Sequence, residues 1–416
     1  MTTLNFLTKS QANQIAQDFQ TPVYVYSQER LEEAADNFLA FPSAYWHSVR
    51  YAMKANPNLN ILKLFNKKWI LLDCSSEYEA YRAIAAWYNP EDLQISWQET
   101  PSQLSDLLEK GVKMVATSLN QIELIWKAKP GIQIWVRINP GMSSWAFTAI
   151  STGGLVSGFG IWHEYIDQIK ETAAKYNVII NKVHIHIGSE NTPESWVNSA
   201  NIWLDFVSQF PEVKTLDLWW GFKKAIMSYE TDADLQSIWK AVAEKFEEFH
   251  KNTGRKIHIE VEPGKAMVIQ SCSVIAKVDD VIDTGNKGYK FIRTTTGMTE
   301  MPRVSMYGVQ QPIHILNNSE TQSEYVVIGH CCESWDLLTP KLYHNESVEP
   351  VLLNDPQVGD TIVFEWTWAY NSSMSMKNYN SFPEAGELLL KNNWEIVEIR
   401  KRQHLEDIWK NEIEVI

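Results

Sequence analysis

The sequence predicts an α/β protein with a TIM-like (β/α)8 barrel and a mainly antiparallel β domain. Three observations indicate this fold class. Between Tyr45 and Glu262, eight short apolar runs alternate with amphipathic stretches of about ten to twenty residues. Strands separated by helices pair in parallel, and eight such units in about 220 residues fit a closed barrel. After Ile269, strand-like runs follow one another with little helix between them.

The barrel strands are expected where short apolar runs end at turn residues. They are 49–53, 69–73, 93–96, 113–117, 132–138, 183–187, 215–218 and 257–261. Helical patterns lie between them, for example at 76–87, 101–110, 164–176 and 231–252. An open doubly wound sheet is the alternative, but no GxGxxG sequence follows an early strand.

The β domain is expected from six later runs with turns between them. They are 274–281, 290–295, 325–328, 361–364, 387–390 and 395–399. The early run 22–26 is expected to join this domain or to cover the edge of the barrel. A chain of 416 residues also favours two domains. We therefore expect a barrel at 28–268, and a β-sandwich or β-barrel-like domain made of 1–27 and 269–416.

Composition favours a cytoplasmic protein that acts on a small molecule. The formal net charge of −14 argues against nucleic-acid and anionic-membrane partners, which select for basic patches. The first twenty residues are polar, and no apolar run approaches the ~20 residues of a membrane helix. No metal site or disulfide is expected from the spacing of the four cysteines, Cys74, Cys272, Cys331 and Cys332.

Polar residues follow several predicted strands of the barrel. In such barrels the working residues gather past the C-terminal ends of the strands, and the loops after strands seven and eight often bind phosphate. The residues at these positions are Lys54, Asp73, His186, Ser189, Gly221 and the run Glu262-Pro263-Gly264-Lys265. One rim would thus combine an amine, an imidazole, a carboxylate and a phosphate cradle.

Five motifs in order make a resemblance specific. They are Tyr51-Ala52-Met53-Lys54-Ala55-Asn56, His184-Ile185-His186-Ile187-Gly188-Ser189, Glu262-Pro263-Gly264-Lys265, Cys332-Glu333-Ser334 and Tyr379-Asn380-Ser381. The series resembles that of the diaminopimelate decarboxylases, pyridoxal-phosphate enzymes with an alanine-racemase-like barrel and a β domain. The match extends from Thr21 to Gln403.

The resemblance implies roles for the barrel residues. Lys54 would bind the cofactor as a Schiff base, which requires an amine dry enough to be neutral when it attacks. Glu262 would face the pyridine nitrogen, where a carboxylate favours the protonated ring. His186 would stack on the ring and Ser189 would hold the phosphate. The remaining expected cofactor contacts are Asp73, Gly221, Pro263, Gly264, Lys265 and Tyr370.

The resemblance also implies roles for the β domain. Cys332 would return a proton to the α-carbon, and it would come from the other subunit of a homodimer. Diaminopimelate carries a second amino-acid head, so its site needs a cation for the far carboxylate and an anion for the far ammonium. Arg303 suits the carboxylate through its bidentate fork. The other expected substrate contacts are Lys265, Tyr307, Glu333 and Tyr370.

The chain departs from the family pattern at several charged positions. Lys265 replaces an arginine, and Thr295 replaces the aspartate before Ala-Gly-Met. Thr299-Glu300 replaces Asn-Asp, and Gly158 stands where a basic residue is usual. These changes bear more on the substrate than on the cofactor.

Tryptophan replaces glycine at many family positions. Trp219-Trp220-Gly221 stands for a triple glycine whose backbone amides would contact phosphate. Nine further tryptophans occupy glycine-like positions: Trp69, Trp87, Trp97, Trp135, Trp145, Trp335, Trp366, Trp368 and Trp394. Changing all eleven to glycine would raise the glycine count from 18 to 29, near the usual ~7%.

Two explanations compete for this pattern. Either the codon UGA encodes glycine in the source organism, or the chain is a degenerate relative that no longer binds cofactor. Drift would not direct so many glycines to one rare residue, so the first is favoured.

The functional hypotheses are ranked accordingly. Decarboxylation of meso-2,6-diaminopimelate to L-lysine leads, followed by decarboxylation of another amino acid with a polar distal group. A cofactor-free pseudoenzyme that binds a partner is the second class. A metal-dependent hydrolase built on His184, His186 and Asp73 is the third, and it lacks further identifiable ligands.

Overall fold

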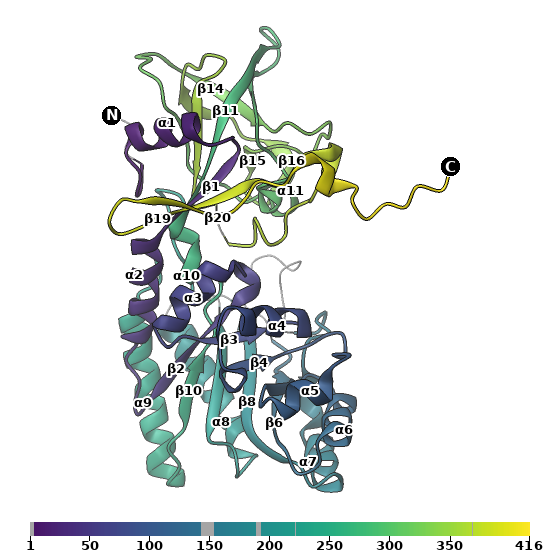
Figure 1. Cartoon of the computed structure of the whole chain (residues 1–416). Coiled ribbons are helices and arrows are strands. Elements are labelled where there is room, and N and C mark those ends of the chain that lie inside the picture. The colour runs from purple at the N-terminus through teal and green to yellow at the C-terminus, as the bar shows by residue number, and fades with distance from the viewer. Residues whose placement is uncertain (1–3, 143–153, 189–192, 221, 368) are drawn as a thin grey trace. The chain divides into compact units, whose positions relative to one another are not determined.

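The computed structural model describes residues 4–142, 154–188, 193–220, 222–367 and 369–416, with only the backbone of residues 187, 188, 219 and 220. The chain forms two compact units (Figure 1). One comprises residues 32–224 and 231–267, and the other comprises residues 1–31, 225–230 and 268–416.

The first unit is a closed parallel barrel of eight strands, as the sequence predicts. The strand order is β5-β4-β3-β2-β10-β9-β8-β6, and a β5–β6 pairing closes the ring. The strands are β2 (His47–Ala52), β3 (Leu71–Cys74), β4 (Leu93–Ile95), β5 (Lys113–Ala116), β6 (Gln133–Asn139), β8 (Ile179–Gly188), β9 (Thr215–Trp220) and β10 (His258–Val261). Each lies within a few residues of its predicted run. The short β7 (Ile161–Trp162) pairs with β6 outside the ring.

Helices alternate with the barrel strands, and the chain supplies a side-chain cap before four of them. They are α2 (Gln28–Leu39), α3 (Leu59–Lys67), α4 (Glu77–Ala85), α5 (Leu104–Glu109), α6 (Leu119–Ala128), α7 (Ile166–Lys175), α8 (Pro193–Ser208) and α9 (Leu235–Thr253). The side chains of Asn58, Ser76, Ser118 and Asp234 accept hydrogen bonds from first-turn N–H groups of α3, α4, α6 and α9. Such caps satisfy donors that a helix cannot pair internally.

The second unit is built on a mainly antiparallel sheet. The order is β17-β14-β12-β11-β1-β19-β20, with β18 paired to β11 and β13 paired to β18. The bounds are β1 (Val23–Ser27), β11 (Cys272–Asp283), β12 (Lys290–Thr294), β13 (Ile313–Ile315), β14 (Gln322–Ile328), β17 (Val351–Asn354), β18 (Thr361–Glu365), β19 (Gly386–Leu390) and β20 (Ile396–Arg400). The early run 22–26 therefore joins this sheet as β1, between β11 and β19.

Short elements complete this unit. They are α1 (Lys9–Asp18), α11 (Pro302–Tyr307), the hairpin of β15 (Pro340–Lys341) and β16 (His344–Val348), and the 3₁₀ turn η6 (Tyr379–Ser381). Ala12 and Ile15 of α1 belong to a buried apolar cluster with Val25, Ile275 and Leu388. In the part of the chain that the structure describes, no helix is long and apolar enough to cross a membrane.

Candidate active site

The barrel part of the site lies where β2, β3 and β10 end. Lys54 is in a 3₁₀ turn, η1 (Met53–Ala55), directly after β2, Asp73 is in β3, and Glu262 follows β10. The Ala52 N–H donates to the Pro263 carbonyl at 3.3 Å, which ties the residue at the end of β2 to the segment after β10. The parallel sheet therefore brings three residues from distant parts of the chain to one rim.

One amide links the two carboxylates of this rim. The Gln94 Nε2 group donates to Asp73 Oδ1 at 3.0 Å and also to Glu262 Oε1. Its Oε1 accepts from Lys182 Nζ at 2.8 Å. Asp73 and Glu262 are almost fully buried, so this hydrogen-bonding fixes their orientation.

Below the rim, the barrel interior holds a chain of ion pairs. Lys182 Nζ lies 2.6 Å from Asp217 Oδ2 and 2.5 Å from Glu260 Oε1, and Arg50 Nε lies 2.6 Å from the same Glu260 atom. All four side chains are almost fully buried. Lys182 shares one face of β8 with His184 and His186, at intervals of two residues. That alternation is the signal that could have predicted this interior cation.

Burial dominates the protonation of the site. It raises the pKa of Glu262 well above its usual range, and the neighbouring Asp217 and Asp73 carboxylates add to the rise. Burial lowers the pKa of the Lys54 amine, although the Asp73 carboxylate opposes it. The imidazole of His184 has a pKa well below its usual value, first through burial and then through the nearby Arg137 cation. Lys54 is thus biased toward the neutral amine that nucleophilic attack needs.

Arg137 is a buried cation at this rim that the sequence reasoning missed. It lies in β6, with His184 as its neighbour in β8 and Asp217 as the next neighbour in β9. Burial lowers the pKa of its guanidinium to about 10, opposed by the carboxylates of Glu262, Asp73 and Asp217. Its position inside an apolar run of a predicted strand was the available signal.

Only one of the three ligands in the metal-site hypothesis, His184, lies in a possible metal-binding group of the described residues. Among the described residues, ligand atoms of His184, Asp217 and Glu262 lie within 4.8 Å of one another. This group contains neither His186 nor Asp73, the other two ligands that the hypothesis named. Asp217 is already paired with the Lys182 ammonium at 2.6 Å.

The predicted phosphate cradle lies partly outside the described residues. Ser189, Gly221 and Trp368 lie outside the described residues, and of Trp219 and Trp220 only the backbone is described, at the end of β9. His186 is buried in β8, and Lys265 begins the short helix α10 (Lys265–Val268) directly after Pro263-Gly264.

The β domain presents Cys332 and Glu333 on a well-anchored loop. Cys332 is exposed, and its backbone N–H donates to Asn380 Oδ1 at 2.8 Å. Glu333 Oε2 accepts from the Tyr379 hydroxyl at 3.3 Å, and its Oε1 accepts from Ser334 Oγ at 3.2 Å. Hydrogen bonds from the Trp335 N–H, Ser334 and Tyr379 lower the pKa of Glu333 and keep it ionised.

Arg303 is framed by two aromatic rings in the same unit. Its guanidinium carbon lies 5.7 Å from the ring centre of Tyr307 and 5.3 Å from that of Tyr370. Tyr370 has a φ of +64°, a conformation that non-glycine residues adopt rarely and mainly where the surroundings impose it. The structure thus brings together three of the predicted substrate-binding residues.

Comparison with known proteins decides the family. Residues 28–269 match the family model described as pyridoxal-dependent decarboxylase, pyridoxal binding domain. The chain belongs to the pyridoxal-dependent decarboxylases. The match covers more than half of the chain and includes Lys54, Asp73, His186 and Glu262.

Individual relatives agree over almost the whole length. A diaminopimelate decarboxylase of Buchnera aphidicola is 29% identical to this chain. The match covers 98% of this chain and 97% of the relative. A crystal structure of a diaminopimelate decarboxylase superposes with a TM-score of 0.91 at 26% identity, covering 99% of this chain and 98% of that one. The Helicobacter pylori enzyme in complex with L-lysine gives 0.84 at 26% identity, with coverages of 96% and 98%. The resemblance predicted from the motifs is confirmed.

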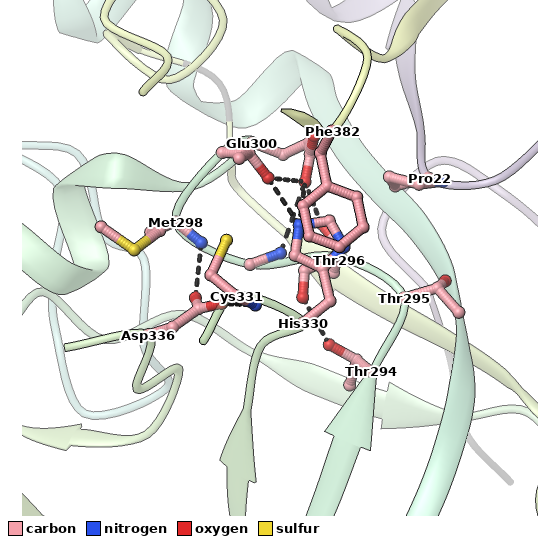
Figure 2. Close-up of polar contacts among 12 residues, drawn as sticks. Pro22, Thr294, Thr295, Thr296, Met298, Glu300, His330, Cys331, Asp336 and Phe382 are labelled. Carbon is pink, nitrogen blue, oxygen red and sulfur yellow. Dashed lines mark hydrogen bonds and ion pairs between the residues drawn. The ribbon is translucent and has the colours of Figure 1, made fainter. Parts of the chain in front are cut away.

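Two of the positions at which this decarboxylase departs from the family pattern, Thr299 and Glu300, lie in one buried cluster (Figure 2). Glu300 Oε2 accepts from Thr296 Oγ1 at 3.0 Å and from Thr299 Oγ1 at 2.8 Å. Thr299 Oγ1 is also hydrogen-bonded to His330 Nε2 at 2.7 Å, and His330 stacks on Phe382 at 3.7 Å between ring centres. Burial raises the pKa of Glu300 to about 7 and lowers that of His330 to about 4. The two altered residues Thr299 and Glu300 therefore contact each other.

Proposed function

We propose that this chain decarboxylates meso-2,6-diaminopimelate to L-lysine, with pyridoxal phosphate bound through Lys54. The observation that carries the proposal is the rim of the barrel, where Gln94 joins the carboxylates of Asp73 and Glu262 beside a lysine of lowered pKa. Relatives named diaminopimelate decarboxylase match nearly the whole chain, which supports diaminopimelate as the substrate. The lysine bound to the Helicobacter pylori enzyme matches the expected product.

The described barrel residues fit the cofactor. Lys54 offers a primary amine that burial biases toward its neutral form. Glu262 is a buried carboxylate whose raised pKa would fall again next to a cationic ring nitrogen, so the pair would hold one proton between them. The chemistry that pyridoxal phosphate supplies when bound is an electron sink for the pair left on the α-carbon when CO₂ departs. His186 would contact the ring, and the run Pro263-Gly264-Lys265 would take part in binding the phosphate.

The β-domain residues would bind and protonate the substrate. Arg303 would bind the distal carboxylate, and its position between Tyr307 and Tyr370 limits the directions in which the guanidinium can turn. Glu333, kept ionised by its hydrogen bonds, would bind the distal ammonium. Cys332 would return the proton. We infer a homodimer in the cytoplasm, in which one subunit supplies the β-domain residues to the other.

The substrate is tested by measuring CO₂ release from meso-diaminopimelate, ornithine, lysine and arginine. The test uses protein with glycine at positions 219 and 220. Diaminopimelate should react fastest, and Arg303→Ala should remove that preference, because the diamine-forming substrates have no distal carboxylate. Faster release from ornithine would refute the diaminopimelate assignment but leave decarboxylation intact.

The cofactor site is tested separately by borohydride reduction and peptide mapping. Reduction should fix pyridoxal phosphate to the peptide that contains Lys54, and Lys54→Ala should abolish the attachment. Attachment to another lysine would refute the site. No visible absorption and no CO₂ from any amino acid would favour the pseudoenzyme hypothesis.

A further inference from the structure

Four tryptophans have a left-handed backbone. Trp69, Trp87, Trp366 and Trp394 have φ values of +61°, +70°, +55° and +67°. An L-residue in this region brings its Cβ too close to the backbone, so the region is populated mainly by glycine and secondarily by asparagine. Four of the ten non-glycine residues with positive φ in the described part of the chain are tryptophans, although only 18 of the 416 residues are tryptophan.

Two of these tryptophans occupy the glycine position of a Schellman motif. At the end of α3, the Trp69 N–H donates to Asn66 and the Ile70 N–H donates to Phe65, at 3.0 and 3.1 Å. At the end of α4, the Trp87 N–H donates to Ile84 and the Tyr88 N–H donates to Ala83, at 2.9 and 3.2 Å. This pair of bonds requires a left-handed residue after the helix cap.

Two other helices of the same barrel end in the same motif and can be compared with these two. Helix α5 ends with the same two bonds, and the left-handed residue there is Gly111, with φ of +93°. Helix α7 ends in the same way at Asn177, with φ of +49°. Equivalent turns thus use glycine and asparagine at the ends of two helices and tryptophan at the ends of two others.

Trp394 occupies the corresponding position of a β-hairpin. The loop between β19 and β20 closes with a bond from the Lys391 N–H to the Glu395 carbonyl at 2.8 Å. Inside it, the Trp394 N–H donates to the Lys391 carbonyl at 2.9 Å. A three-residue hairpin loop of this kind is a type I turn followed by a left-handed residue, which is ordinarily glycine.

Packing does not explain these indoles. Trp69, Trp87 and Trp394 have 87%, 70% and 63% of their surface exposed. Trp87 gains a contact with the Lys63 ammonium, 3.8 Å from its ring centre. Most of each indole therefore stays in water. The small area that is buried contributes little free energy to offset the cost of a left-handed backbone.

We propose that the functional protein carries glycine at positions 69, 87, 366 and 394, because the codon UGA is translated as glycine in its native cell. The backbone evidence does not depend on the proposed function. All four positions belong to the eleven that stand at glycine-like sites in the sequence. None of the other described tryptophans, such as Trp46, Trp239 and Trp409, has a positive φ. The same decoding would give glycine at 219 and 220, next to the expected phosphate site.

The gene and the native protein test the proposal directly. The codons for positions 69, 87, 366 and 394 should be UGA, and those for Trp46, Trp239 and Trp409 should be UGG. Tryptic peptides of protein isolated from the native organism should have the mass of glycine at the four positions. UGG codons there, or peptides with the mass of tryptophan, would overturn the proposal.

Stability measurements test the physical premise on the full-length recombinant chain. Trp69→Gly, Trp87→Gly and Trp394→Gly should each move the urea midpoint upward, because glycine relieves the left-handed strain. Trp409→Gly is the matched control: this indole is 45% exposed and its φ is −113°, so the change should leave the midpoint unchanged or lower it. A lowered midpoint in the three variants, or an equal rise in the control, would contradict the assignment.

Discussion

The carboxylate of Asp336 accepts a hydrogen bond from the backbone N–H of Cys331 at 2.7 Å. The other carboxylate oxygen of Asp336 accepts a hydrogen bond from the Met298 N–H at 2.6 Å. The backbone carbonyl of Asp336 accepts one from the Gly329 N–H at 2.7 Å. Asp336 therefore closes the loop that carries Cys332 and Glu333 and ties it to the segment at Met298 (Figure 2). No side chain fits at Gly329, because a Cβ there would lie 2.2 Å from the Asp336 oxygens.

The first prediction concerns this anchor. In Asp336→Asn, one oxygen becomes an NH₂ group that faces a backbone N–H, and an unsatisfied buried donor costs about 1–3 kcal/mol. The exposed Cys332 thiol should then react faster with iodoacetamide, and turnover should fall while cofactor affinity stays the same. The exposed Glu346→Gln is the control. Unchanged thiol reactivity in Asp336→Asn would show that the loop is held by other contacts.

The second prediction concerns the pH dependence of stability. Burial raises the pKa of Glu300 to about 7 in the folded protein, above its value of about 4.3 in the unfolded chain. The folded state therefore holds the proton more tightly. The stabilisation that this tighter proton binding gives the folded state is fully present below about pH 4 and is lost as the pH rises through 7.

Glu300→Gln should remove that part of the pH profile. Between about pH 4.5 and 7 the wild type should lose up to about 3 kcal/mol of unfolding free energy from this group, whereas the variant should not. Urea unfolding at several pH values measures the difference. Parallel profiles for the two proteins would mean that Glu300 does not titrate in this range.

The third prediction separates binding from chemistry at Glu262. Replacing Glu262 by Gln keeps the size of the side chain but removes the charge that would hold a proton on the ring nitrogen. Turnover should fall by at least about tenfold, a change of about 1.4 kcal/mol or more, while cofactor affinity changes much less. Titration with pyridoxal phosphate, followed by absorbance, gives the affinity. Equal losses in both would indicate a purely structural role.

The fourth prediction concerns the ion pairs inside the barrel. Lys182→Met would leave the buried Asp217 and Glu260 carboxylates without their shared cation, and breaking a buried pair costs about 3–5 kcal/mol. The surface control Lys170→Met should change stability by less than about 0.5 kcal/mol. Adding Asp217→Asn to Lys182→Met should recover part of the loss. A neutral Lys182→Met would argue against a net structural role for the ammonium.

The barrel was predictable because its signal is local. Each strand is a short apolar run with a turn at its end, and each helix between them has its own periodicity. The partners of strand β1 were not predictable, because Val23 pairs with Gly386 and Ile275 in sequence-distant strands. The strands β13 and β17, three and four residues long, were not predicted.

The candidate site was predictable where motifs follow strand ends, as at Lys54, Asp73 and Glu262. The interior charges at Lys182, Asp217 and Glu260 were missed because their pairing joins three strands that lie far apart in the sequence and become neighbours only in the folded barrel. The cluster around Glu300 was missed because Thr299, His330 and Phe382 meet only through tertiary packing.

The place of β1 in its sheet has a consequence for synthesis on the ribosome. Val23 leaves the ribosome 363 residues before Gly386, its partner in β19. At about 5–20 residues per second, that interval lasts about 20–70 s. The strand can pair with β11 earlier, but its other edge stays open until the chain is almost complete. An open strand edge is a template for association with other chains, so nascent chains that stop before residue 386 should aggregate or recruit chaperones.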